Sequence, residues 1–212
     1  HLHRITEVRE KAAVLPVGCD LRRLDAPAIR SSPPLILWNQ RWEYDKAPQT
    51  FFQALYTLAD EGFAFRVALA GKNERQRAPE FDEARERLGE RVVHFGYASA
   101  AEYIALLHRA DVVVSTAIHE FFGVAVVEAI YCGSFPVLPR RLSYPELIPA
   151  TYHGECLYDD FAGLLERLRW TLRHPSAAAA IAEGLRPAVA RFDWSDLAPC
   201  YDEAMVGVRR ET

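Results

Sequence analysis

DVVVSTAIHEFFGVAVVEAIYCGSFP, residues Asp111 to Pro136, contains the change of pattern that decides the fold of this chain. It begins with the β-branched run 112–114, passes through a short polar break and continues with apolar residues at helical spacing. This pattern predicts a buried strand, a tight loop and a helix. Two carboxylates, Glu120 and Glu128, stand eight positions apart across the start of that helix. We expect the rest of the chain to present them.

The bulk composition is that of an ordinary globular domain. The chain has 212 residues, of which 50% are hydrophobic and 25% charged, so it can bury one sizeable core. A formal net charge of -4 gives no general attraction to nucleic acid or to anionic membranes. No apolar run approaches the roughly 20 residues of a membrane span, and no secretory leader is recognisable. We therefore expect a soluble, cytoplasmic protein.

The cysteines and histidines show no metal-binding pattern. CxxC and Cys/His ligand spacings are both missing, and His119 has no second His or Cys at ligand spacing. All four cysteines lie in or beside apolar segments, which predicts buried free thiols in a reducing compartment: Cys19, Cys132, Cys156 and Cys200.

Strand and helix patterns alternate from residue 34 onward. Strands are expected at 35–38, 65–70, 91–95, 112–114, 135–138 and 155–158, and helices between and after them, including 48–60, 80–88, 160–173 and 176–191. Ser99 is expected to cap a helix to Arg109, with Glu102 completing a capping box. This alternation predicts an α/β fold, a doubly wound parallel sheet of the Rossmann-like type. Upstream, the apolar segment Val14 to Asp20 predicts an edge strand, and a linker rich in Pro and Ser follows it.

A doubly wound sheet binds its ligand beyond the carboxyl ends of its strands, which makes the loops at those ends candidate sites. After the first strand, Arg41 offers a planar fork of donors and Lys46 a mobile charge, a combination suited to a diphosphate. In the alternative interpretation, these two cations pair with Glu43 and Asp45 on a solvated loop.

The helix start after the fourth strand is a second candidate for anion binding. Its first amides lack intrahelical partners, and Gly123 allows close approach to the backbone. Eight residues at ~1.5 Å rise place Glu120 and Glu128 roughly 12 Å apart, about the span from ribose to hexose in a nucleoside diphosphate sugar. That separation exceeds the about 5 to 9.5 Å of a glycosidase pair. Alternatively, Glu128 is an exposed helix carboxylate, although its neighbours are apolar.

The residues just described resemble a known family. Glu120 and Glu128, with Phe122 and Gly123 between them, are similar to the E-x7-E motif of retaining glycosyltransferases of the GT-B type, family 4, and Arg41 with Lys46 match that family's phosphate-binding pair. The segments ILWNQRWEYDKAPQTFF, HFGYAS and HEFFGVAVVEAIYCGSFPVLPRRLSYPELIP resemble the tRNA-queuosine α-mannosyltransferases. Gln40 departs from the Gly that ordinary family 4 members carry before the Arg.

The resemblance implies a role for each motif residue. Glu120 would be catalytic and would hold the donor sugar together with Phe121, and Glu128 would hold the ribose. The diphosphate would be bound by Arg41, Lys46 and the segment Phe122, Gly123 and Val124. Tyr97 and Ala98 match the position where relatives contact the nucleotide base, and Asn73 follows the second strand, where it could reach the base or the phosphates.

The same resemblance implies an activity and a domain organisation. Residues 1–33 would be an interdomain hinge and the tail of a missing N-terminal domain, 34–191 the donor domain, and 192–212 a crossover helix. The donor would be GDP-mannose, used without a metal or other cofactor, and the acceptor queuosine in tRNA, held by the missing half. Two alternatives stay open: another nucleotide sugar with a glycan or lipid acceptor, or a non-catalytic sugar-nucleotide-binding module.

Overall fold

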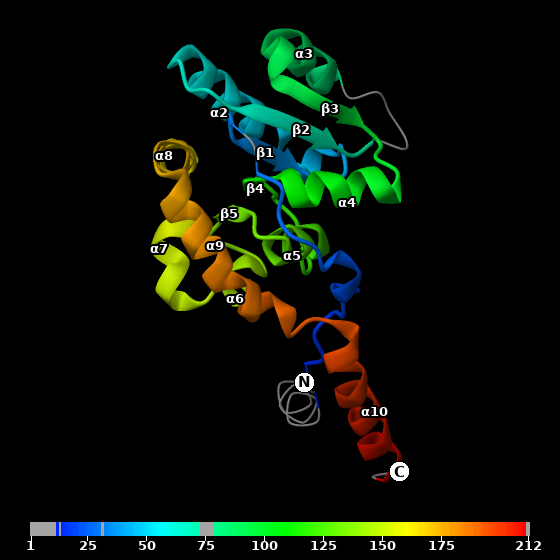
Figure 1. Ribbon diagram of the computed structural model, residues 1–212. Helices are drawn as coiled ribbons and strands as arrows, with labels where there is room; N and C mark the ends of the chain where they lie inside the picture. Colours follow the sequence, from blue (N-terminus) through cyan, green and yellow to red (C-terminus); the bar gives the residue numbers. More distant parts are fainter. Residues whose placement is uncertain (1–11, 13, 31, 73–78, 211–212) are drawn as a thin grey trace, which may run out of the picture.

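The computed structural model describes residues 12, 14–30, 32–72 and 79–210, and Figure 1 shows their arrangement. The centre of this part of the chain is a six-stranded sheet in the order β3-β2-β1-β4-β5-β6. Strands β1 to β6 cover Leu35–Trp38, Arg66–Ala70, Val92–Gly96, Val112–Val114, Phe135–Pro139 and Leu157–Tyr158. The order confirms the predicted doubly wound fold, because the chain builds outward from β1 on one side and then crosses back to add β4 on the other.

Strand β1 is the pivot of the sheet. It pairs in parallel with β2 on one side, through Trp38 and Leu69, and with β4 on the other, through Leu37 and Val113. The remaining pairings are parallel as well. The carboxyl ends of β1 and β4 therefore adjoin where the strand order reverses, which is the position at which open α/β sheets bind ligands.

Helices cover both faces of the sheet (Figure 1). Consecutive residues of a strand point to opposite faces, so Trp38 packs on Phe51 of α2 with ring centroids 4.5 Å apart, whereas Asn39 reaches Ala125 of α5. Helix α2 (Pro48–Asp60) contacts α3 (Pro79–Leu88) and α8 (Phe161–Arg173), while α5 (Val124–Tyr131) contacts α4 (Ala100–Arg109) and α9 (Pro175–Ala190). Shorter helices follow at Tyr144–Leu147 (α6) and His153–Cys156 (α7).

The ends of these helices follow from local sequence signals. Pro48 occupies the first turn of α2, where its missing amide hydrogen costs nothing, and Gly62 follows the helix with a positive φ of 81°. The predicted capping box of α4 is confirmed, because Ser99 N donates to Glu102 Oε2 at 2.8 Å and Glu102 N to Ser99 Oγ at 3.4 Å. Asp160 caps α8 through the amide of Gly163. In the part of the chain that the structure describes, no helix is both long and apolar enough to cross a membrane.

The segment before the sheet differs from its prediction. The strand expected at Val14 to Asp20 is wrong, because only Cys19 forms a bridge, and it does so with Asp193 rather than with the sheet. The Cys19 amide donates to Phe192 O at 2.7 Å, and the Trp194 amide donates back to Cys19 O at 2.9 Å. The apolar residues of this segment thus lie against the start of α10 (Trp194–Arg210), the helix that extends away from the sheet in Figure 1.

Asp193 joins this segment to α10. Its Oδ2 accepts from the amides of Leu21 and Arg22 at 2.9 and 3.0 Å, and its Oδ1 accepts from the amide of Ser195 at 2.9 Å. Gly18 packs directly against Trp194, since a Cβ at Gly18 would lie 2.4 Å from the Trp194 ring. We call Asp193 with these three amides the Asp193 clamp.

The prediction of buried free thiols holds for three cysteines and is wrong for the fourth. Cys200 lies on an exposed position of α10, because the helix extends away from the core there, whereas the other three are buried: Cys19, Cys132 and Cys156.

Candidate functional site

Lys46 and Glu120 meet at the junction between the carboxyl ends of β1 and β4. Lys46 Nζ lies 3.3 Å from Glu120 Oε2, 3.4 Å from Asp45 Oδ2 and 2.6 Å from the carbonyl oxygen of His119. The Lys46 side chain is 7% exposed and the Glu120 side chain 20%. A buried ammonium with three oxygen acceptors is a fixed cation at the sheet edge rather than a solvated surface charge.

The two loops that carry Lys46 and Glu120 are joined by hydrogen bonds from one side chain and from backbone amides. Thr116 Oγ1 donates to the carbonyl oxygens of Lys46 and Ala47 at 2.7 and 3.0 Å. The amides of Ile118 and His119 donate to the carbonyl oxygen of Asp45. Ala47 has a left-handed backbone with φ 46°, which is uncommon for a residue with a Cβ and is held by these surrounding bonds. The distance between the two side chains is therefore set by a rigid pair of loops.

Arg41 does not share this buried environment. Its side chain is 66% exposed, and Nη1 lies 3.2 Å from Glu43 Oε2. The alternative interpretation, pairing on a solvated loop, describes the geometry of Arg41, whereas the pair that Lys46 forms with Asp45 is buried. The phosphate-binding role of Arg41 stays a prediction. The exposed position of its side chain is compatible with that role, because an exposed guanidinium can turn toward a ligand.

The start of α5 has the geometry expected of an anion-binding helix terminus. Gly123 precedes the helix with φ 95° and ψ 44°, a left-handed conformation that favours glycine. A Cβ at Gly123 would lie 3.2 Å from the ring of Tyr144, so the backbone approaches its neighbours closely. Val124, the first helical residue, is 40% exposed. The amides of Val126 and Val127 donate to the carbonyl oxygen of Gly123, so the free donors expected at this helix start are the amides of Val124 and Ala125.

Glu128 is buried and paired. The residue is 7% exposed, so the interpretation as an exposed helix carboxylate is wrong. Arg23 Nη2 donates to Oε1 at 2.9 Å and Tyr103 Oη donates to Oε2 at 2.8 Å. Burial and the neighbouring Glu128 charge raise the pKa of Tyr103, which keeps its hydroxyl protonated and able to donate. Asn39 extends this series of hydrogen bonds by donating from Nδ2 to Tyr103 Oη at 3.1 Å.

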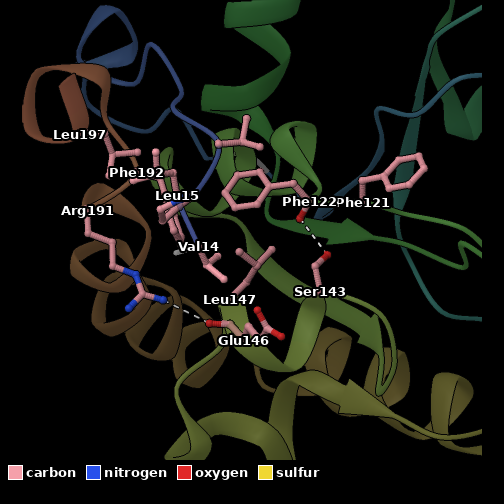
Figure 2. A pocket seen from close by; sticks show the side chains of 12 residues that line it. Val14, Leu15, Phe121, Phe122, Ser143, Glu146, Leu147, Arg191, Phe192 and Leu197 are labelled. Atoms are coloured by element: carbon pink, nitrogen blue, oxygen red, sulfur yellow. Dashed lines mark hydrogen bonds between the residues drawn. The ribbon is translucent and has the colours of Figure 1, made fainter. Parts of the chain in front are cut away.

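The two phenylalanines of the predicted sugar-binding loop point in different directions (Figure 2). Phe121 is fully exposed, whereas Phe122 packs edge-to-face on Phe192 with ring centroids 5.0 Å apart. Ser143 Oγ donates to the carbonyl oxygen of Phe122 at 3.0 Å and so ties the loop to the start of α6.

An apolar cavity of about 530 Å³ lies beside this loop (Figure 2). Arg191 closes one side by donating to the carbonyl oxygen of Glu146 at 3.2 Å. The cavity lies between the linker segment and α6, and the predicted diphosphate-binding pair Arg41 and Lys46 lies elsewhere. Its lining comprises Val14, Leu15, Pro16, Val17, Phe121, Phe122, Ser143, Glu146, Leu147, Arg191, Phe192 and Leu197.

The residues expected near a nucleotide base lie at the carboxyl end of β3. Tyr97 is 69% exposed, and Lys72 Nζ lies 5.2 Å from the centroid of its ring. Ala98 is half-buried just before the cap of α4. Asn73 lies outside the described residues. The base-binding role of all three stays a prediction.

Sequence reasoning missed several residues that shape this site. Arg23 and Tyr103 hold Glu128, and Arg141 donates from Nε to the carbonyl oxygen of Ala117 at 3.1 Å, which fixes the loop leading to Glu120. Tyr103 follows a recognisable cap at Ser99, but its partner Glu128 lies on another helix, so no local sequence pattern predicts the contact. Among the described residues no group of three or more His, Cys, Asp or Glu could hold a metal ion. The expectation of metal-free chemistry stays a prediction.

A family model and several known proteins are similar to this chain. The model described as Glycosyl transferases group 1 matches residues 23–186. The tRNA-queuosine alpha-mannosyltransferase of Drosophila melanogaster is 38% identical over 140 residues, which are 66% of this chain and 36% of that protein.

Solved structures share the fold at lower identity. Sucrose-phosphate synthase from Thermosynechococcus elongatus matches with a TM-score of 0.80 and 21% identity, over 94% of this chain and 53% of that one. HepE from Anabaena, in complex with UDP and glucose, matches with a TM-score of 0.72 and 20% identity, over 89% of this chain and 55% of that one. The chain thus spans about a third of the curated relative named above and just over half of these two solved chains. These likenesses confirm the fold expected of one Rossmann-like half of a GT-B glycosyltransferase.

Proposed function

This chain belongs to the family of glycosyl transferases group 1, and from that membership we propose that it is the donor-binding half of a retaining mannosyltransferase that takes GDP-mannose and acts on queuosine in tRNA. The observation that carries the proposal is the contact of Lys46 Nζ with Glu120 Oε2 at 3.3 Å, at the switch point of the sheet. In a sugar nucleotide the distal phosphate and the sugar are bonded to each other, so the groups that bind them must also be neighbours.

Each residue of the site has a role in this reaction. Lys46, Arg41 and the amides at the start of α5 stabilise the negative charge that develops on the departing diphosphate. Glu120 accepts hydrogen bonds from sugar hydroxyls and fixes the anomeric carbon. The acceptor hydroxyl attacks from the face that the diphosphate leaves, so the configuration at the anomeric carbon is retained. No metal is needed, because these cations and amides neutralise the leaving group.

The sugar and acceptor are proposed from the likeness to the tRNA-queuosine mannosyltransferase, which is 38% identical to this chain over 140 residues. The net charge of -4 offers no general attraction to RNA. We therefore assign tRNA binding to a further domain of the whole protein, and we expect the chain alone to bind the donor and transfer little or no sugar.

Ligand-induced stabilisation tests the donor. Thermal unfolding is measured with GDP, UDP, ADP and GDP-mannose, and a ligand at a hundred times its Kd adds about 2.7 kcal/mol. We expect GDP and GDP-mannose to stabilise and the others not to. Lys46→Ala should abolish the effect, whereas Arg140→Ala, at a cation that pairs with Asp159 instead, should keep it. Stabilisation by none of the four ligands would refute the assignment.

Sugar transfer is tested on the whole protein. Radiolabelled mannose from GDP-mannose is followed into tRNA that contains queuosine, against tRNA that lacks it. Glu120→Gln should lower kcat at least about a hundredfold, since removing one group that stabilises the transition state has effects of this size. Unchanged turnover in this variant would show that Glu120 is not catalytic. Transfer by the 212-residue chain alone would contradict the assignment of tRNA binding to another domain.

A different donor is the second candidate. It is favoured by the likeness to HepE, whose structure contains UDP and glucose. Stabilisation by UDP but not by GDP would support this candidate and a glycan or lipid acceptor. If nucleotide binds but no sugar moves in the whole protein with any donor, the chain is a sugar-nucleotide-binding module instead.

A further inference from the structure

The apolar cavity of about 530 Å³ beside the loop that carries Glu120 has the volume of a small-molecule site (Figure 2). Its walls come from four separate parts of the chain: residues 14–17, the loop before α5, α6 and residues 191–197. Phe122 and Phe192 pack edge-to-face and form an aromatic wall, which Leu147 of α6 extends. Walls of this kind suit a planar, largely apolar group.

Gly123 relates this cavity to Glu120. The position that a Cβ at Gly123 would occupy lies 3.7 Å from Glu120 Cγ and also 3.7 Å from Leu147 Cδ1. Leu147 lines the cavity, so the cavity wall and the Glu120 side chain meet at the same glycine. In the proposed reaction the donor sugar is bound at Glu120, and the acceptor hydroxyl must approach the anomeric carbon there. The body of the acceptor then extends from Glu120 toward the cavity.

The charged groups of the lining favour a cationic ligand. Glu146 is exposed, and among the described residues its carboxylate forms no hydrogen bond or ion pair. Arg191, the cation of the lining, donates instead to the backbone carbonyl oxygen of Glu146 at 3.2 Å, and its Cζ lies 4.7 Å from the centroid of the Phe192 ring. The guanidinium is thus held by a carbonyl and a ring, and the Glu146 carboxylate stays open to a cation from outside.

We propose that this cavity binds the acceptor nucleoside, with a planar heterocyclic base against the aromatic wall and an amine attached to the base paired with Glu146. Queuosine has this chemistry, because a secondary amine, protonated at neutral pH, links its deazaguanine base to the cyclopentene diol. The inference rests on the proposed function, from which it takes the acceptor. It adds that this chain binds the modified nucleoside itself, while a further domain binds the rest of the tRNA, and that Glu146 is a specificity-determining residue.

The test is a titration of the 212-residue chain with three small ligands, followed by NMR. They are queuosine, 7-aminomethyl-7-deazaguanine, which is planar and cationic, and 7-cyano-7-deazaguanine, which is planar and uncharged. The aminomethyl base should bind about three- to fivefold more tightly than the cyano base, as expected for one exposed ion pair. Glu146→Gln should remove this preference and leave the affinity for the cyano base unchanged. Glu203→Gln, at an exposed carboxylate of α10 outside the lining, should keep the preference.

A second pair of variants tests the cavity itself. Val17 lines the cavity and is 46% exposed, so Val17→Trp fills the space without loss of core packing. It should weaken binding of all three ligands at least about tenfold, because apolar contact area is blocked, and leave GDP-mannose binding unchanged. Val206→Trp, on α10 at a residue that is 49% exposed and outside the lining, is the matched control and should keep all three affinities.

Each other outcome would overturn the inference. Equal affinity of the unsubstituted chain for the aminomethyl and cyano bases would remove the role of Glu146. The same affinities in Val17→Trp and Val206→Trp would place the binding site outside the cavity. Octyl glucoside bound in place of the three ligands would assign the cavity to an alkyl chain, and ligands bound by the chain but not by the whole protein would show that another domain fills it. Binding of GDP-mannose without any of the three ligands would sink the inference and leave the donor assignment standing, whereas binding of none of the four would sink both.

Discussion

The Asp193 clamp should make a large and pH-dependent contribution to stability. Asp193→Asn keeps the size of the side chain but removes the charge. It also replaces one carboxylate oxygen by an NH2 group, which cannot accept the hydrogen bonds that backbone amides now donate to the carboxylate. Burial alone would raise the pKa of Asp193, but hydrogen bonds from Ser195, Arg22 and Leu21 outweigh it and lower the pKa from 3.8 to about 2.

The fall in pKa gives the size of the charge effect. It corresponds to roughly 2 kcal/mol, and screening at a site beside the exposed Arg22 reduces this to about 1–2 kcal/mol. An unsatisfied buried amide at Leu21 adds about 1–3 kcal/mol. We expect Asp193→Asn to lower the free energy of unfolding by about 2–5 kcal/mol at pH 7.

The pH dependence separates the charge effect from packing. Because the folded pKa of Asp193 is depressed, its contribution is complete above about pH 4 and disappears as the pH falls toward 2. Urea unfolding of both proteins from pH 7 to 3 should therefore show a difference that shrinks in acid. Asp196→Asn, at an exposed partner of Arg22, is the control and should cost below about 1 kcal/mol. A difference under 0.5 kcal/mol for Asp193→Asn at pH 7, or one independent of pH, would refute the reasoning.

Three further predictions concern the candidate site and the thiols. Lys46→Ala leaves Glu120 without its ammonium partner and should cost about 3 kcal/mol in urea unfolding, against below about 1 kcal/mol for Arg41→Ala; equal costs would contradict the burial of Lys46. Gly123→Ala should lower the free energy of unfolding by about 1–3 kcal/mol and weaken nucleotide binding, because φ is 95° and the new Cβ would meet Tyr144. In the native protein a disulfide reagent should titrate about one thiol quickly, that of Cys200, and four after denaturation. More than one fast thiol would be unexpected, since burial raises the pKa of the other three to about 11 or 12: Cys19, Cys132 and Cys156.

The parts of the fold that were predicted correctly are those with local signals. The run 112–114 is β-branched and apolar and forms the buried strand β4, and Pro48 marks the first turn of α2. Ser99 and Glu102 are three residues apart and form their capping box within one helical turn. Such contacts are made by neighbours in sequence, so the sequence pattern contains both partners.

The misses are contacts between distant residues. Arg23 and Glu128 are 105 positions apart, and Leu21 and Asp193 are 172 apart. The apolar segment from Val14 to Asp20 has the composition of a strand, but it packs on α10, which no short window of sequence includes. Composition predicts whether a segment is buried, whereas the partner that buries it depends on the whole topology.

The charges of the site limit how it can attract a diphosphate. Lys46 already faces Glu120 and Asp45, and Arg41 faces Glu43, so these two cations lie among three carboxylates. The cluster has no positive excess, and a general electrostatic attraction cannot supply the affinity. In the proposed function, directed donors supply the affinity instead: the guanidinium fork, the ammonium and the amides at the start of α5, which follow the left-handed Gly123. We therefore expect selectivity for a diphosphate to depend on the backbone geometry between Glu120 and Glu128 as much as on the two cations.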